Sequence, residues 1–102
     1  LEAGISGSMS SALLPEKIAP VIDHFWNNEK DKAEEIYNNI LPLINFENRQ
    51  CGFRATKTVM KEGGVIKSDF CRDPIKPLDL DTKNLLLNFA KRYDLLTYKW
   101  GK

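Results

Sequence analysis

Apolar residues recur three and four positions apart in four stretches of this chain, a spacing that places them on one face of an α-helix. The first stretch opens at Pro15, a favoured first residue because the first N–H groups of a helix have no intrahelical acceptor. Asn27 and Asn28 follow the last apolar position and are expected to end this helix. Its apolar positions are Ile18, Val21, Ile22, Phe25 and Trp26.

The second stretch predicts a helix that runs to about residue 44, with Asn28 as its cap. Pro42 lies inside this helix and is expected to kink it or to end its first half. Residues 45–52 are polar, and we expect them to form a loop. The apolar positions of the second stretch are Ala33, Ile36, Tyr37, Ile40, Leu41 and Ile44.

A third helix is expected over residues 53–62, because Gly63 and Gly64 follow it and glycine commonly stands just past a helix end. Residues 65–80 hold three of the five prolines and predict an extended connector. The side chains that the third helix should bury are Phe53, Thr56, Val59 and Met60.

The last helix is expected to begin after a cap at Asp79 or Asp81. Its apolar side should carry Leu85, Leu86, Phe89, Ala90 and Tyr93. Residues 97–102 are aromatic and basic but too short to assign to an element.

Small residues dominate positions 4–11, and they suggest a short strand followed by a loop. A strand without a partner in the sequence implies that its sheet lies elsewhere, and a chain that opens on Leu1 is expected to begin inside a protein. The predicted fold is therefore mainly α, with about four helices after one short strand. It suits the C-terminal part of a (β/α)8 TIM barrel. Residues 1–28 would be the last barrel strand and helix, and residues 29–102 a C-terminal helical extension.

Composition narrows the function classes. The 102 residues carry 15 basic and 14 acidic side chains, a formal charge of +1, so the basic excess typical of nucleic-acid binders is missing. No apolar run approaches the roughly 20 residues that span a bilayer. Cys51, Cys71 and His24 are too few and too far apart for a disulfide scaffold or a zinc site, and reduced thiols fit a cytoplasmic protein.

Five segments, taken in order, resemble the dihydrodipicolinate synthase/N-acetylneuraminate lyase family of pyruvate-type Schiff-base lyases. Together with the elements between them, the match covers nearly the whole chain in order. The five segments are Ala3-Gly4-Ile5-Ser6-Gly7, Leu41-Pro42-Leu43-Ile44, Phe53-Arg54-Ala55-Thr56-Lys57-Thr58-Val59-Met60, Gly64-Val65-Ile66 and Cys71-Arg72-Asp73-Pro74. Within the family, residues 43–49 and 57–64 look most like dehydratases of 2-keto-3-deoxy sugar acids. A dihydrodipicolinate synthase or an aldolase is the alternative within the family.

The resemblance implies a (β/α)8 enzyme in which a lysine forms a Schiff base with a 2-keto acid and a tyrosine moves protons. Both residues would lie before this chain, so no catalytic residue is expected in it and the chain alone should be inactive. The imine serves as the electron sink, so neither a cofactor nor a metal is implied. Such enzymes assemble as homo-oligomers, tetramers or dimers, in the cytoplasm.

Two serines are the candidate substrate-binding residues. Ser10 and Ser11 follow the small-residue segment, and Ser11 matches the position where relatives that act on sugar acids hold a substrate hydroxyl. A serine that only caps the following helix is the alternative.

Other polar residues have structural interpretations. Lys57 is placed on a helix rather than at the end of a strand, where barrel enzymes keep their chemistry. Arg54 and Arg72 could bind a carboxylate, but salt bridges explain them as well. His24 is expected at the edge of its helix. A non-enzymatic helical interaction module is the alternative function from another class, since amphipathic helices would serve it equally well.

Overall fold

The computed structural model describes residues 1–102, and every regular element in them is helical. The α-helices are α1 (Pro15–Trp26), α2 (Lys30–Asn45), α3 (Arg54–Glu62) and α4 (Leu80–Arg92). A π-helix, Phe46–Cys51, continues α2, and a 3-10 turn, Leu96–Tyr98, lies near the C-terminus. The four predicted α-helices are thus confirmed.

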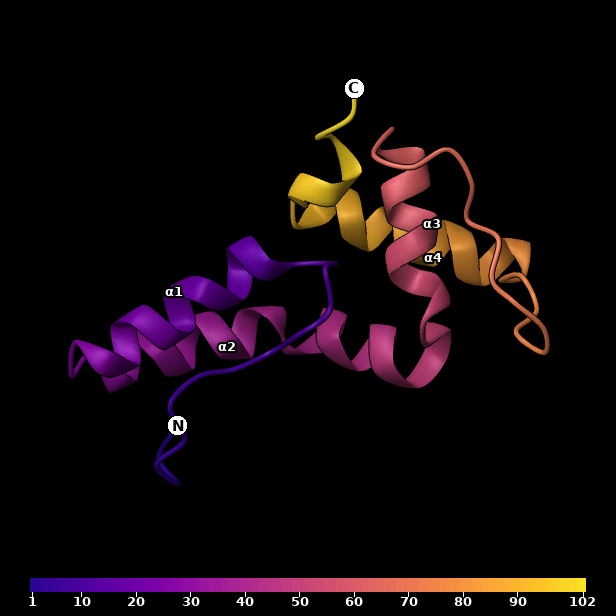
Figure 1. Ribbon diagram of the computed structural model, residues 1–102. Helices are drawn as coiled ribbons and strands as arrows, with labels where there is room; N and C mark the ends of the chain where they lie inside the picture. Colours follow the sequence, from indigo (N-terminus) through magenta and orange to yellow (C-terminus); the bar gives the residue numbers. More distant parts are fainter.

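The elements form two neighbouring groups. A short turn joins α1 to α2 as a helical hairpin, while α3 packs against α4 and the C-terminal turn (Figure 1). Core side chains from both groups meet in one cluster, which includes Leu13 and Leu14 ahead of α1, Leu43 of α2, Val59 of α3 and Leu86 of α4. Burial of this shared apolar surface holds the two groups together.

The predicted strand at residues 4–11 is wrong for this chain. Residues 2–12 are exposed and contain no regular element. Their one backbone hydrogen bond runs from the Gly4 N–H to the Leu1 carbonyl, at 3.0 Å. An extended segment becomes a strand only when a neighbour satisfies its N–H and C=O groups, and no later segment forms backbone hydrogen bonds with residues 4–11.

The loop predicted at residues 45–52 is also wrong. α2 runs through Pro42 without ending there, and the π-helix follows it. The π-helix buries Glu47 and Cys51, and the Thr56 hydroxyl donates a hydrogen bond to Glu47 Oε1 at 3.3 Å. The polar residues of this segment predict a loop, because a charged residue is normally exposed. Here the carboxylate of Glu47 is buried, and its hydrogen bond to Thr56 makes that burial possible.

Two details around the helix starts differ from expectation. Phe53 is 68% exposed rather than buried, because Gly52, with φ of +65°, turns the chain just before α3. Asn28 does not cap α2: it has φ of +62°, and Glu29 precedes the helix instead. For α4 the cap is Asp79, whose Oδ2 accepts a hydrogen bond from the Thr82 N–H at 3.3 Å.

Residues 94–102 form what we call the C-terminal hook. Leu95 is fully buried in the core, and the Gly101 N–H donates to the Gly63 carbonyl at 2.9 Å. A Cβ atom built on Gly63 would overlap the Thr97 carbonyl oxygen. The end of α3 and the hook therefore touch backbone to backbone, an approach that only glycine permits.

Candidate functional site

Ser10 and Ser11 lie together in the exposed segment that leads into α1. The Ser11 hydroxyl accepts a hydrogen bond from the Leu13 N–H at 3.3 Å, and the Ser10 hydroxyl donates to the Ser11 carbonyl at 3.3 Å. The N-cap position of α1 is Leu14, so Ser11 closes a turn ahead of the helix. The Ser11 O–H remains free to donate, which leaves a hydroxyl-rich loop able to bond a polar ligand.

The hook holds the chain directly after the two serines. Thr97 Oγ1 donates to the Leu13 carbonyl at 3.0 Å, and Glu16 Oε1 accepts from the Leu96 N–H at 3.0 Å. Glu16 Oε2 is buried without a hydrogen-bond partner. The sequence carries no signal for Thr97 or Glu16, because these contacts join residues 84 and 80 positions apart and no local pattern indicates them.

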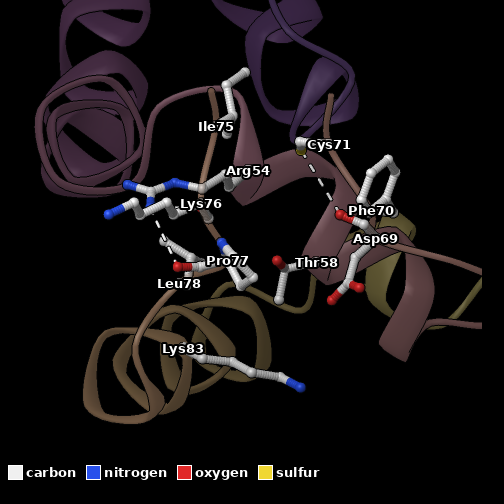
Figure 2. Close-up of a pocket in the computed structure, with 10 residues that line it drawn as sticks. All are labelled: Arg54, Thr58, Asp69, Phe70, Cys71, Ile75, Lys76, Pro77, Leu78 and Lys83. Carbon is white, nitrogen blue, oxygen red and sulfur yellow. Dashed lines mark hydrogen bonds between the residues drawn. The ribbon is translucent and has the colours of Figure 1, made fainter. Parts of the chain in front are cut away.

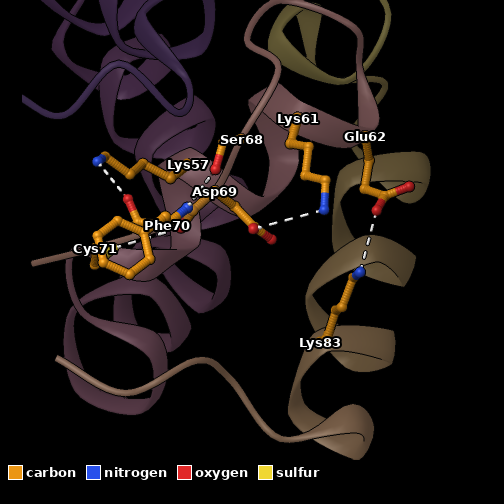
Figure 3. Close-up of polar contacts among 8 residues, drawn as sticks. All are labelled: Lys57, Lys61, Glu62, Ser68, Asp69, Phe70, Cys71 and Lys83. Carbon is orange, nitrogen blue, oxygen red and sulfur yellow. Dashed lines mark hydrogen bonds and ion pairs between the residues drawn. The ribbon is translucent and has the colours of Figure 1, made fainter.

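Lys57 fastens the connector to α3. Its Nζ donates to the Phe70 carbonyl at 2.9 Å and lies 5.6 Å from the centre of the Phe53 ring. Nearby ion pairs join Lys61 to Asp69 at 3.6 Å and Lys83 to Glu62 at 3.1 Å (Figure 3). The Lys57 hydrogen bond and the Lys61–Asp69 ion pair link α3 to the connector, and the Lys83–Glu62 ion pair links α3 to α4.

A cavity of about 280 Å³ lies between α3, the connector and α4. Arg54 lines it, together with Lys76, Asp69 and Phe70 (Figure 2). Two nitrogens of the Arg54 guanidinium are already bonded: Nε donates to the Cys51 carbonyl at 2.9 Å and Nη1 to the Lys76 carbonyl at 3.0 Å. Arg54 thus ties the connector to the end of the π-helix, and Arg72 is exposed within the connector.

The remaining polar groups lie at the surface. His24 Nδ1 is 3.3 Å from Glu29 Oε1, and Lys32 Nζ is 2.7 Å from Glu29 Oε2. The hydrogen bonds from Lys32 and His24 lower the pKa of Glu29. The structure gathers no group of three or more His, Cys, Asp or Glu side chains that could hold a metal ion. None of its helices is both long and apolar enough to cross a membrane.

Cys51 and Cys71 are both buried and unpaired. Burial raises the pKa of the Cys51 thiol from 9.0 to about 11. At pH 8 we expect about 100-fold less thiolate than an exposed cysteine has, and correspondingly slow alkylation, because the thiolate is the reactive form. Mass spectrometry after iodoacetamide treatment should show protection of Cys51 that unfolding in denaturant removes, with Cys71→Ala used to isolate its signal. Equal rates in the folded and unfolded chain would contradict this.

Two comparisons relate the chain to known proteins. The model of the dihydrodipicolinate synthetase family matches residues 1–92. L-2-keto-3-deoxyarabonate dehydratase of Azospirillum brasilense is 41% identical over 101 residues, which are 99% of this chain and 33% of that enzyme. The chain therefore spans about one third of the length of this curated relative.

Proposed function

The chain belongs to the dihydrodipicolinate synthetase family, and from this premise we propose that it is part of a Schiff-base lyase that dehydrates a 2-keto-3-deoxy sugar acid. The observation that carries the proposal is the 41% identity, over almost all of the chain, to a dehydratase of this substrate class. A dihydrodipicolinate synthase or an aldolase of the same family is the alternative.

The chain corresponds, in this proposal, to the C-terminal third of a TIM-barrel enzyme. Residues 1–28 belong to the end of the barrel, and residues 29–102 form a helical extension. Supporting this, residues 2–12 are exposed and α1 contains no fully buried residue, so both offer surface to further parts of a barrel.

The proposed chemistry uses a lysine contributed by the rest of the enzyme. Its amine condenses with the 2-keto group and releases water, and the resulting iminium withdraws electrons from the neighbouring carbon. That carbon loses a proton to a base, and the hydroxyl on the next carbon leaves as water once it is protonated. Ser10 and Ser11 would bond the substrate hydroxyls and so orient the leaving group. The reaction needs no metal and no organic cofactor.

Assembly and location follow the same proposal: a homo-oligomer, tetramer or dimer, in the cytoplasm. Several large apolar side chains are exposed on the chain and are available for contacts between subunits or with the barrel. They include Met9, Trp26, Phe70 and Trp100. The same exposed apolar side chains also suit a helical interaction module without enzymatic activity. Formation of a Schiff base with pyruvate distinguishes the lyase from such a module.

Borohydride trapping with pyruvate tests the function in the intact protein. We expect a reduced adduct on one lysine outside residues 1–102, because the family resemblance places the Schiff-base lysine ahead of this chain. Lys57 has a different role here, since its amine is bonded to a backbone carbonyl. Lys57→Arg should therefore still be labelled, and the isolated chain should show neither an adduct nor lyase activity. Absence of any adduct on the intact protein would reject the Schiff-base lyase and favour the interaction module.

A further inference from the structure

We propose that the C-terminal hook is a positioning device for the Ser10–Ser11 loop, with Thr97 and Glu16 as the residues that set where the two hydroxyls stand. This inference rests on the proposed function, since it assigns the hook a role in recognising the hydroxyl groups of a sugar-acid substrate.

The peptide groups of Leu13 carry the first part of the argument. The Leu13 N–H donates to the Ser11 hydroxyl at 3.3 Å, and the Leu13 carbonyl accepts from Thr97 Oγ1 at 3.0 Å. Thr97 is only 6% exposed, so this hydrogen bond is shielded from competing water. The hook and the serine loop thus hold the same residue from its two sides, and a shift of the hook would move the partner of Ser11.

Glu16 supplies a second attachment one turn further along. Its Oε1 accepts from the Leu96 N–H at 3.0 Å, which binds the first turn of α1 to the residue beside Thr97. The carboxylate of Glu16 thus ties the start of α1 to the hook through a side chain-to-backbone hydrogen bond.

The hook can act as a fixed reference because its own backbone has little freedom. Gly101 donates to the Gly63 carbonyl at 2.9 Å, and Leu95 is buried in the core. The Lys99 ammonium pairs with Asp94 at 2.8 Å across the turn. By contrast, residues 2–12 have a single backbone hydrogen bond, so the serine loop has no comparable support of its own.

Thr97→Val tests the inference because it removes the donor and keeps the shape. In the intact enzyme we expect KM for a 2-keto-3-deoxy sugar acid to rise roughly 3- to 10-fold, the effect of one weakened hydrogen bond. Pyruvate has no sugar hydroxyls, so borohydride trapping with pyruvate should be unchanged. Thr97→Ser restores the donor and should restore KM.

Leu96→Pro is a second variant in case Thr97→Val does not fold. The substitution removes the N–H group whose hydrogen bond Glu16 accepts. Leu95 already has the extended backbone (φ −65°, ψ 134°) that a following proline requires. We expect KM to change in the same direction, with trapping again unchanged.

An unchanged KM in folded Thr97→Val would overturn the positioning role. Equal losses of sugar-acid turnover and pyruvate trapping would also overturn it, since they would show a general structural defect. If the wild-type enzyme forms a pyruvate adduct and both variants have the same KM as the wild type, the proposed function stands and the positioning role of the hook is wrong. If the wild type forms no adduct, the proposed function fails, and the substrate role of the hook fails with it.

Discussion

Gly63→Ala is expected to destabilise the chain by about 3 kcal/mol or more, the upper end of the usual cost of overpacking a core. Gly63 is buried at the end of α3, and its φ of −80° is ordinary for any residue, so the effect is purely steric. The new Cβ would overlap the Thr97 carbonyl and approach Tyr98 Cα to 2.8 Å. Backbone atoms of the hook cannot rotate away as a side chain could, so the hook must move.

Thermal unfolding followed by circular dichroism should show a Tm lowered by more than about 12 °C in Gly63→Ala. Gly7→Ala is the matched control, because Gly7 has open space around its Cβ position and no positive φ. We expect its Tm to remain close to that of the wild type. If both variants had the same Tm as the wild type, the close approach between α3 and the hook would be wrong.

Leu86→Ala is expected to cost about 2–5 kcal/mol, the range for removing a large aliphatic side chain from a core. Leu86 is fully buried and belongs to the cluster that joins the helical hairpin to α3 and α4. Since domains of this size are stable by only about 5–15 kcal/mol, the variant should lose much of its cooperative folding.

Leu85→Ala is its natural control. Leu85 precedes Leu86 on α4 and is 53% exposed, so the same truncation should change the free energy of unfolding by about 0.5 kcal/mol or less. Urea titration of both variants measures the difference. Similar midpoints for the two would mean that α4 presents a different face to the core.

The helices could be predicted because their signals are local. Pro15 starts α1 and Gly63 ends α3, as the spacing of apolar residues and the end signals indicated. The position of a cap could be narrowed to Asp79 or Asp81 but no further, since either carboxylate could bond a nearby N–H. The choice of Asp79 depends on backbone geometry, with φ of −66° and ψ of 160°.

The π-helix and the exposure of Phe53 could not be predicted, because both depend on distant packing. From the sequence, Glu47 is expected to be exposed to solvent. In the structure it is buried, because the Thr56 hydroxyl, nine positions later, donates a hydrogen bond to it. Phe53 fits the apolar pattern of α3, but the turn at Gly52 removes it from the buried face.

For the candidate site, the serines could be proposed from the sequence, but the contacts that hold them could not. Ser10 and Ser11 are candidates through a resemblance to a family, which needs no knowledge of contacts. Thr97 and Glu16 matter through contacts between the two ends of the chain, and such pairs have no fixed spacing for a pattern to reveal.

The hook also affects when the chain can fold during its synthesis on the ribosome. Its partners, Leu13 and Glu16, are synthesised first and must wait for residues 95–97, about 80 positions later, before their hydrogen bonds can form. Closing so long a loop is slow, so nascent chains would lack the hydrogen bonds from the hook to Leu13 and Glu16 until residues 95–97 had been made. A product truncated before residue 94 would lose Leu95 from the core and both hydrogen bonds from the hook to the start of α1, and cellular proteases would act on the less stable form.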